Sequence, residues 1–162
     1  MSKTSIGVYC NKEVYSVLLS DSGNMETLKV EKLEGRMRHF RFIKYLKEIV
    51  DVDLCVIYEN DEAKPIINYI KREKKRDYLA IDFSPIPNHP NYHENPDLPT
   101  LVRKLVYRKR QDDVLFSDYT ELQEKIERIC LTDETIHMRT LDGFVLAFMA
   151  AAHGIFSLED KS

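Results

Sequence analysis

Tryptophan is absent from this sequence, and glycine is scarce, with five residues among 162. The glycines are scattered, so the chain lacks the glycine-rich loop that holds phosphate groups in many nucleotide-binding proteins. No serine stands in a nucleophile-elbow pattern, and no cysteine is placed beside a histidine as a catalytic pair would be. These absences argue against the common nucleotide-binding and acyl-transfer sites.

Cysteine is scarce as well, with only Cys10, Cys55 and Cys130. Their odd number and wide separation fit neither a disulfide framework nor the paired spacing of a zinc site. Cys10 and Cys55 lie in apolar, strand-like runs, which predicts buried free thiols. Free thiols suit a reducing compartment, so we expect a cytoplasmic protein.

Long hydrophobic runs are also missing. The longest, residues 144–152, is about half the length of a membrane span. Residues 1–5 are polar and lack the apolar centre of a signal peptide, so we expect no membrane association. Hydrophobic residues nevertheless make up 43% of the chain and charged residues 31%, which predicts one globular domain over residues 1–162.

The first part of the chain has the patterns of an antiparallel meander. Apolar runs predict strands over residues 6–10, 14–20 and 26–33, and Asp21–Asn24 is a strong turn signal between the last two. In the third strand we expect the apolar positions to be Leu28, Val30 and Leu33.

Helices and strands alternate after this meander. Apolar residues three to four apart predict an amphipathic helix over residues 36–50, with Met37, Phe40, Ile43 and Leu46 on its inner face. A buried strand is predicted over residues 53–58, a second helix over 63–75 and a fifth strand over 78–83.

The last part of the chain is predicted to be helical after a polar loop. Residues 84–100 hold five of the six prolines, together with His89 and His93. These histidines have the spacing of a helical metal pair, but the prolines favour a polar loop. Helices follow over residues 100–110, over 119–129 and from about 140, and the last is apolar nearly all round and must be covered on most sides.

This order of elements resembles the ribonuclease H-like fold of Holliday-junction resolvases, resolvase-like insertion-sequence transposases and phage large terminases. Three local matches carry the resemblance: Ile6–Val8 leading into the first hairpin, Tyr58–Asn60 after the fourth strand, and Thr140–Gly143 before the last helix. It implies an α/β domain with a mixed five-stranded sheet, an N-terminal antiparallel meander and helices on both faces.

The resemblance also implies a metal-dependent nuclease site. Such enzymes use Mg²⁺ or Mn²⁺, held by carboxylates, to cleave phosphodiesters. By position, Glu59 and Asp142 would be the catalytic metal ligands, with Asp21 and Asp82 as further ligands. The partner would then be DNA or RNA.

The carboxylate set departs from the family pattern. Tyr9 stands about where the family has its first-strand aspartate, and a phenol is not ionised at neutral pH. Arg139 stands where a further acid would lie, one turn from Asp142. A catalytically inactive module for protein interaction or assembly is therefore the alternative function. A half-domain of the actin or sugar-kinase type is a third reading, although the chain lacks the phosphate loops.

Simpler roles exist for the same acids. Glu59 and Asp142 each precede a predicted helix, where acidic side chains stabilise the helix N-terminus. The apolar last helix could also be a homodimer interface or the binding surface for another protein partner.

Basic residues are clustered although the formal net charge is −3. If the clusters share a surface, they form a groove for phosphates, and otherwise they are ordinary solvated helix faces. The predicted nucleic-acid-binding residues are Arg36, Arg38, Lys74, Lys75, Arg108 and Arg110.

Overall fold

The computed structural model describes residues 2–49, 51–82, 98–111, 114–115, 119–131 and 142–160. One mixed sheet forms its centre, with the strand order β5-β4-β1-β2-β3-β6. The strands are β1 (Lys3–Cys10), β2 (Val14–Asp21), β3 (Met25–Leu33), β4 (Leu54–Tyr58), β5 (Asp77–Ile81) and β6 (Val114–Leu115).

The strand directions match the predicted architecture. β1, β2 and β3 form the antiparallel meander, β4 is parallel to β1, and β5 is parallel to β4. All five predicted strands are present. The sheet has a sixth strand in addition, because the two-residue β6 pairs with β3 in parallel, and a strand this short has no detectable sequence pattern.

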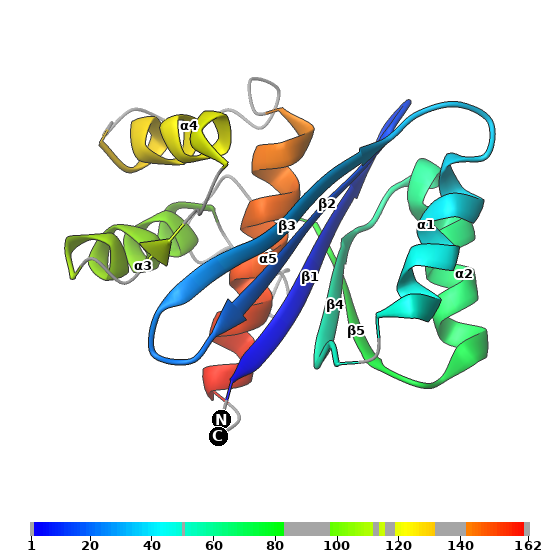
Figure 1. Ribbon diagram of the computed structural model, residues 1–162, viewed down its shortest axis with the longest axis horizontal. Coiled ribbons are helices and arrows are strands. Elements are labelled where there is room, and N and C mark those ends of the chain that lie inside the picture. The colour runs from blue at the N-terminus through cyan, green and yellow to red at the C-terminus, as the bar shows by residue number, and fades with distance from the viewer. Residues whose placement is uncertain are drawn as a thin grey trace.

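Helices cover both faces of the sheet, as predicted (Figure 1). One face carries α1 and α2, and the other carries α5 with α3 and α4 beyond it. The helices are α1 (Arg38–Glu48), the short 3-10 helix η1 (Asp61–Ala63), α2 (Lys64–Glu73), α3 (Leu98–Arg110), α4 (Thr120–Leu131) and α5 (Gly143–Asp160).

Helix α5 lies directly against β1 because glycines remove the side chains between them. A Cβ atom on Gly7 would overlap the backbone of Ala147 and Ala151, and one on Gly154 would overlap Ser5. The sheet and the neighbouring helices bury α5 so well that residues 145–152 are each at most 3% exposed. The chain therefore covers most of its own apolar helix, so the expected need for a partner to cover this helix does not arise at residues 145–152.

The inner face of α1 differs from the prediction. Phe42 and Leu46 are fully buried against the sheet, whereas Met37 and Phe40 are 56% and 60% exposed. Two apolar stripes overlap in this sequence, and the one that contains Phe42 faces the sheet. Met37 and Phe40 are consequently surface residues.

A β-bulge changes the alternation in β3. The register shifts between Leu18, which lies opposite Lys29, and Leu19, which lies opposite Thr27. Leu28 is the extra residue and is 46% exposed, contrary to its predicted core position. Met25 and Thr27 are buried there instead.

The thiols of Cys10 and Cys55 are free and buried, as the sequence predicted. Burial raises the pKa of each thiol to about 12. Within the described residues, no helix has the length and apolar character that crossing a membrane requires.

Candidate functional site at the strand ends

The carboxyl ends of β1, β4 and β5 lie at one edge of the sheet because these strands are parallel. Helix α5 begins at the same edge, since the side chain of Tyr15 on β2 packs against Gly143 at its first turn. We call this region the strand-end site. It contains Tyr9, Tyr15, Tyr58, Glu59, Asp82 and Asp142.

Tyrosine rings occupy the centre of the strand-end site. Tyr9 follows Ser5 and Gly7 on the face of β1 that contacts α5, because alternate strand residues share a face. Its ring lies 5.3 Å from that of Tyr58, edge to face, and 6.4 Å from that of Tyr15. Phe144 extends the cluster, with its ring 4.9 Å from Tyr15.

Two of these tyrosines are held neutral by their surroundings. Partial burial, together with the hydrogen bond that its hydroxyl donates to Glu13, raises the pKa of Tyr15 to about 12. Partial burial and donation to Asp82 at 2.7 Å raise the pKa of Tyr58 as well. Neither phenol is therefore an anionic ligand near neutral pH.

Both carboxylate oxygens of Asp142 are engaged. Oδ1 accepts the backbone N–H of Val145 at 2.9 Å, which makes Asp142 the N-cap of α5. Oδ2 forms an ion pair with Lys125 on α4, and this hydrogen bond raises the pKa of the lysine. The helix-cap role is therefore observed, and the sequence contained no signal for the Lys125 partner.

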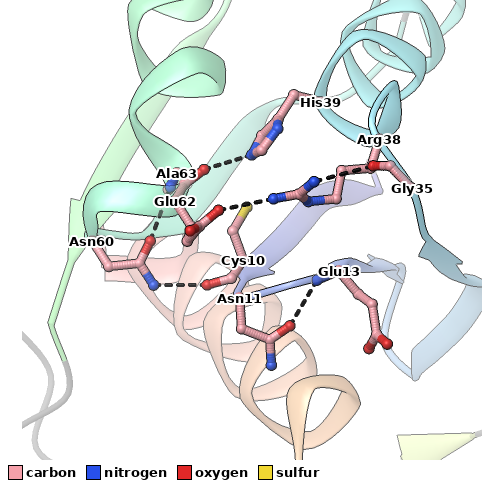
Figure 2. Close-up of polar contacts among 9 residues, drawn as sticks. All are labelled: Cys10, Asn11, Glu13, Gly35, Arg38, His39, Asn60, Glu62 and Ala63. Atoms are coloured by element: carbon pink, nitrogen blue, oxygen red, sulfur yellow. Dashed lines mark hydrogen bonds and ion pairs between the residues drawn. The ribbon is translucent and has the colours of Figure 1, made fainter.

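Glu59 and Asp82 lie side by side in the sheet. The backbone N–H of Glu59 donates to Ile81 at 2.8 Å, and the side chain of Glu59 is exposed. Asn60, rather than Glu59, caps the next helix: its Oδ1 accepts the N–H of Ala63 at 2.9 Å, and its Nδ2 donates to Cys10 (Figure 2). Glu59 thus remains available to a ligand.

Asp21 does not belong to the strand-end site, contrary to the prediction. It lies opposite Lys3, at the start of β1, whereas Tyr9 is near the end of that strand. Its carboxylate binds the guanidinium of Arg108 on α3, at 2.6 and 3.2 Å. Asp21 and Arg108 therefore join α3 to the β2–β3 turn at the opposite edge of the sheet.

The observed donor set does not fit a pair of divalent cations. Such a centre needs several carboxylates that converge on shared ions. The first strand supplies Tyr9, and Lys125 neutralises Asp142. No cluster of three or more His, Cys, Asp or Glu side chains suited to a metal occurs in the part of the chain that the structure describes. His89 and His93 lie outside that part.

The predicted phosphate-binding residues divide between the two sides of the sheet. Arg36 lies just before α1, Arg38 begins it, and Lys74 and Lys75 follow α2, so these four belong to the α1–α2 layer. Arg108 lies on α3, where its side chain is only 12% exposed. The side chain of Arg110 lies outside the described part of the chain.

A cleft of about 310 Å³ adjoins the strand-end site. The cleft is lined by Val30, Tyr119, Leu122, Lys125 and Phe144. It adjoins Asp142, because Lys125 forms an ion pair with that residue and Phe144 follows it closely in the sequence. No local sequence pattern indicates this cleft, because its walls combine β3 with α4 and α5, which follow about 90 residues or more later in the chain.

Two solved structures are similar to this chain over nearly its whole length. The T. thermophilus RuvC structure, in complex with a Holliday junction substrate, has a TM-score of 0.55 and 10% identity, and covers 99% of this chain and 98% of its own. The Fowlpox virus resolvase, in complex with its substrate Holliday junction DNA, has a TM-score of 0.53 and 12% identity, with coverages of 94% and 99%. No family model and no curated protein sequence matches the chain. These likenesses show that the chain has the ribonuclease H-like fold of the resolvases.

Proposed function

We propose that this protein binds branched nucleic acid at the strand-end site without hydrolysing it. The observation that carries this proposal is the replacement of the first-strand carboxylate by Tyr9, beside an Asp142 that Lys125 already neutralises. The resemblance to two resolvases that bind Holliday junctions favours branched DNA as the partner.

The aromatic surroundings of the site suit bases that have left the stack. Branch points contain such bases, and stacking on an aromatic side chain contributes roughly 1–3 kcal/mol for each base. The cleft beside the site offers Tyr119 and Phe144 as aromatic walls. An unpaired base in this cleft would lie next to the ion pair of Lys125 with Asp142.

Metal-dependent cleavage is the second candidate function. Glu59, Asp82 and Asp142 all lie at the same edge of the sheet, and this gathering of carboxylates is the observation that favours it. Hydrolysis through these residues would require Asp142 to leave Lys125. The two candidates make opposite predictions for the same substrate.

One experiment separates them. A labelled four-way junction and a duplex of the same sequence are titrated with the protein in the presence of Mg²⁺ or Mn²⁺, and binding and cleavage are both recorded. We expect tighter binding to the junction and no cleavage. Cleavage that Glu59→Gln abolishes would overturn the proposal in favour of the nuclease.

A matched pair of variants tests the role of the cleft. Tyr119→Ala removes one aromatic wall, and we expect junction affinity to fall about 5- to 150-fold, as the loss of one stacked base implies. Tyr119→Phe keeps the ring and should bind like the wild type. If Tyr119→Ala binds the junction as tightly as the wild type does, base stacking in this cleft is contradicted.

A further inference from the structure

The charge of this chain is strongly asymmetric. Residues 36–48 and 64–76, which form α1, α2 and their ends, contain eleven Lys and Arg residues but only two Asp and Glu. Their formal charge is therefore +9, whereas that of the remaining residues is −12. Because both helices cover the same face of the sheet, this positive charge is concentrated on one side of the molecule (Figure 1).

Nine of the eleven cations are exposed and form a surface that we call the basic face. It consists of Arg36, Arg41, Lys44, Lys47, Lys64, Lys71, Arg72, Lys74 and Lys75. Within the described residues, only Lys64 and Lys75 of these nine reach an acidic side chain, at 3.0 Å and 4.0 Å. Most of the positive charge on this face is thus not neutralised by the protein itself.

The two remaining cations have structural roles. Arg38 donates to Glu62 at 2.9 Å and to the carbonyl of Gly35 at 3.0 Å, which fixes the start of α1 on η1 (Figure 2). Arg76 donates to the carbonyls of Leu46 and Ile49 at the end of α1. These contacts join α1 to the elements around α2, so the exposed cations of both helices belong to one fixed surface.

The chemistry of the basic face suits a phosphodiester backbone better than a lipid surface. The sheet-facing sides of both helices are buried, with Phe42, Ile66 and Ile70 at most 2% exposed. Apart from Met37 and Phe40 at one end of α1, neither helix has a large exposed apolar side chain to insert into a membrane. Helix α1 has 11 residues and is about 17 Å long, which corresponds to about half a turn of duplex. Several cations can therefore contact successive phosphates.

Two exposed apolar side chains lie at one end of the basic face. Met37 immediately precedes α1 and Phe40 is in its first turn, and both lie between Arg36 and Arg41 in the sequence. That end of α1 contacts η1 through Arg38 and His39, and η1 follows the strand-end residue Glu59 (Figure 2). The basic face consequently extends to the strand-end site and ends there in side chains that suit contact with bases.

We infer that the basic face binds the phosphate backbone of one arm of the branched nucleic acid whose branch point occupies the strand-end site. This inference rests on the proposed function. It also explains how an acidic site could hold a polyanion, because Glu59 and Asp82 repel phosphates and the attraction must come from another surface.

The test is the salt dependence of binding, measured by fluorescence anisotropy with a duplex and a four-way junction. The logarithm of the binding constant falls linearly with the logarithm of the salt concentration, and each lost phosphate contact reduces the magnitude of this slope by about 0.9 on duplex DNA. We expect Lys44→Gln/Lys71→Gln to lower that slope by about 2 and to weaken binding to both ligands. The ratio of junction to duplex affinity should stay unchanged, since it depends on the strand-end site.

The matched control is Lys3→Gln/Lys104→Gln, which makes the same change in net charge outside the basic face. Its slope should equal that of the wild type. If both double variants lose the same slope, or neither loses any, the inference is overturned. A different outcome would separate the inference from the proposed function. If Lys44→Gln/Lys71→Gln reduces the salt dependence but the wild type binds duplex and junction equally well, the basic face binds phosphates and the proposed function is refuted.

Two further outcomes also decide the inference. Absence of binding to both nucleic acids would overturn the inference and the proposed function together. Salt-dependent binding to phosphatidylserine vesicles with no binding to the duplex would assign the basic face to a membrane surface and overturn the inference. Thermal unfolding of each variant confirms that the exposed substitutions leave the fold intact.

Discussion

Replacing Arg108 by methionine should destabilise this protein by about 3 kcal/mol at neutral pH, near the lower end of the range for a broken buried ion pair. The guanidinium makes a bidentate contact with Asp21, also lies 3.3 Å from Glu159, and donates to the carbonyl of Gly23 at 3.1 Å. The Arg108 and Asp21 side chains are 12% and 7% exposed, so little water can replace the lost contacts.

The loss should depend on pH in a defined direction. The hydrogen bonds from Arg108 hold the pKa of Asp21 below its ordinary value. A lowered folded-state pKa stabilises the fold above the unfolded pKa near 4, and this contribution disappears as the pH falls through the folded value. The difference between wild type and Arg108→Met should therefore be largest at neutral pH and shrink in acid.

Urea unfolding followed by circular dichroism measures both effects. Arg103→Met changes an exposed arginine on the same helix and should alter the unfolding free energy by no more than about 0.5 kcal/mol. The double variant Arg108→Met/Asp21→Asn should recover part of the loss, because Asp21→Asn removes the buried carboxylate that loses its bidentate partner. A loss below about 1 kcal/mol, or one that is constant with pH, would refute a buried, charge-assisted contact.

Two other substitutions test the core and the thiols. Gly7→Ala should lower the unfolding free energy by at least roughly 1–3 kcal/mol, the cost of a typical overpacked core, because the added methyl group would overlap the backbone of α5. An unchanged melting curve would contradict the close contact. In a Cys130→Ser variant, Cys10 and Cys55 should not react with a thiol reagent at pH 8 until urea unfolds the chain, because burial raises the pKa of both thiols. Rapid labelling of the folded protein would contradict their burial.

The order and type of most elements could be predicted because each has its own local pattern. The meander, both βα units and the apolar last helix followed from alternation, turn residues and three-to-four spacing. The inner face of α1 did not, because Phe40 and Phe42 belong to two overlapping apolar stripes, and the choice between them depends on packing against the sheet, where Phe42 is buried. The bulge at Leu28 likewise depends on pairing with β2.

The candidate site was predictable only to the level of the strand ends. Glu59, Asp82 and Asp142 do lie at one edge, because parallel strands bring their ends together. The predicted place of Asp21 in the site was wrong, because its position depends on the direction of β2 and on Arg108, a partner 87 residues away on α3. Lys125 and the cleft around Tyr119 had no local signal at all.

The charge runs were visible in the sequence, but their shared surface was not. Arg36 and Lys75 lie at opposite ends of the α1–α2 layer. They share one side of the sheet because the β3–β4 and β4–β5 connections, which contain α1 and α2, both cover that face. A run of like charge alone does not distinguish a binding surface from a solvated helix.

The glycine contact between α5 and β1 has a consequence for how such a protein can diverge. At Gly7 the backbone of β1 lies against the backbone of α5, and at Gly154 the backbone of α5 lies against the side chains of Ser5 and Val56, so the separation of helix and strand is set away from the side chains at the strand ends. Position 9 can therefore hold either a carboxylate or a phenol without a change in the distance between α5 and β1. Substitutions at the strand ends can therefore change the chemistry of the site while the contact between α5 and β1 stays the same.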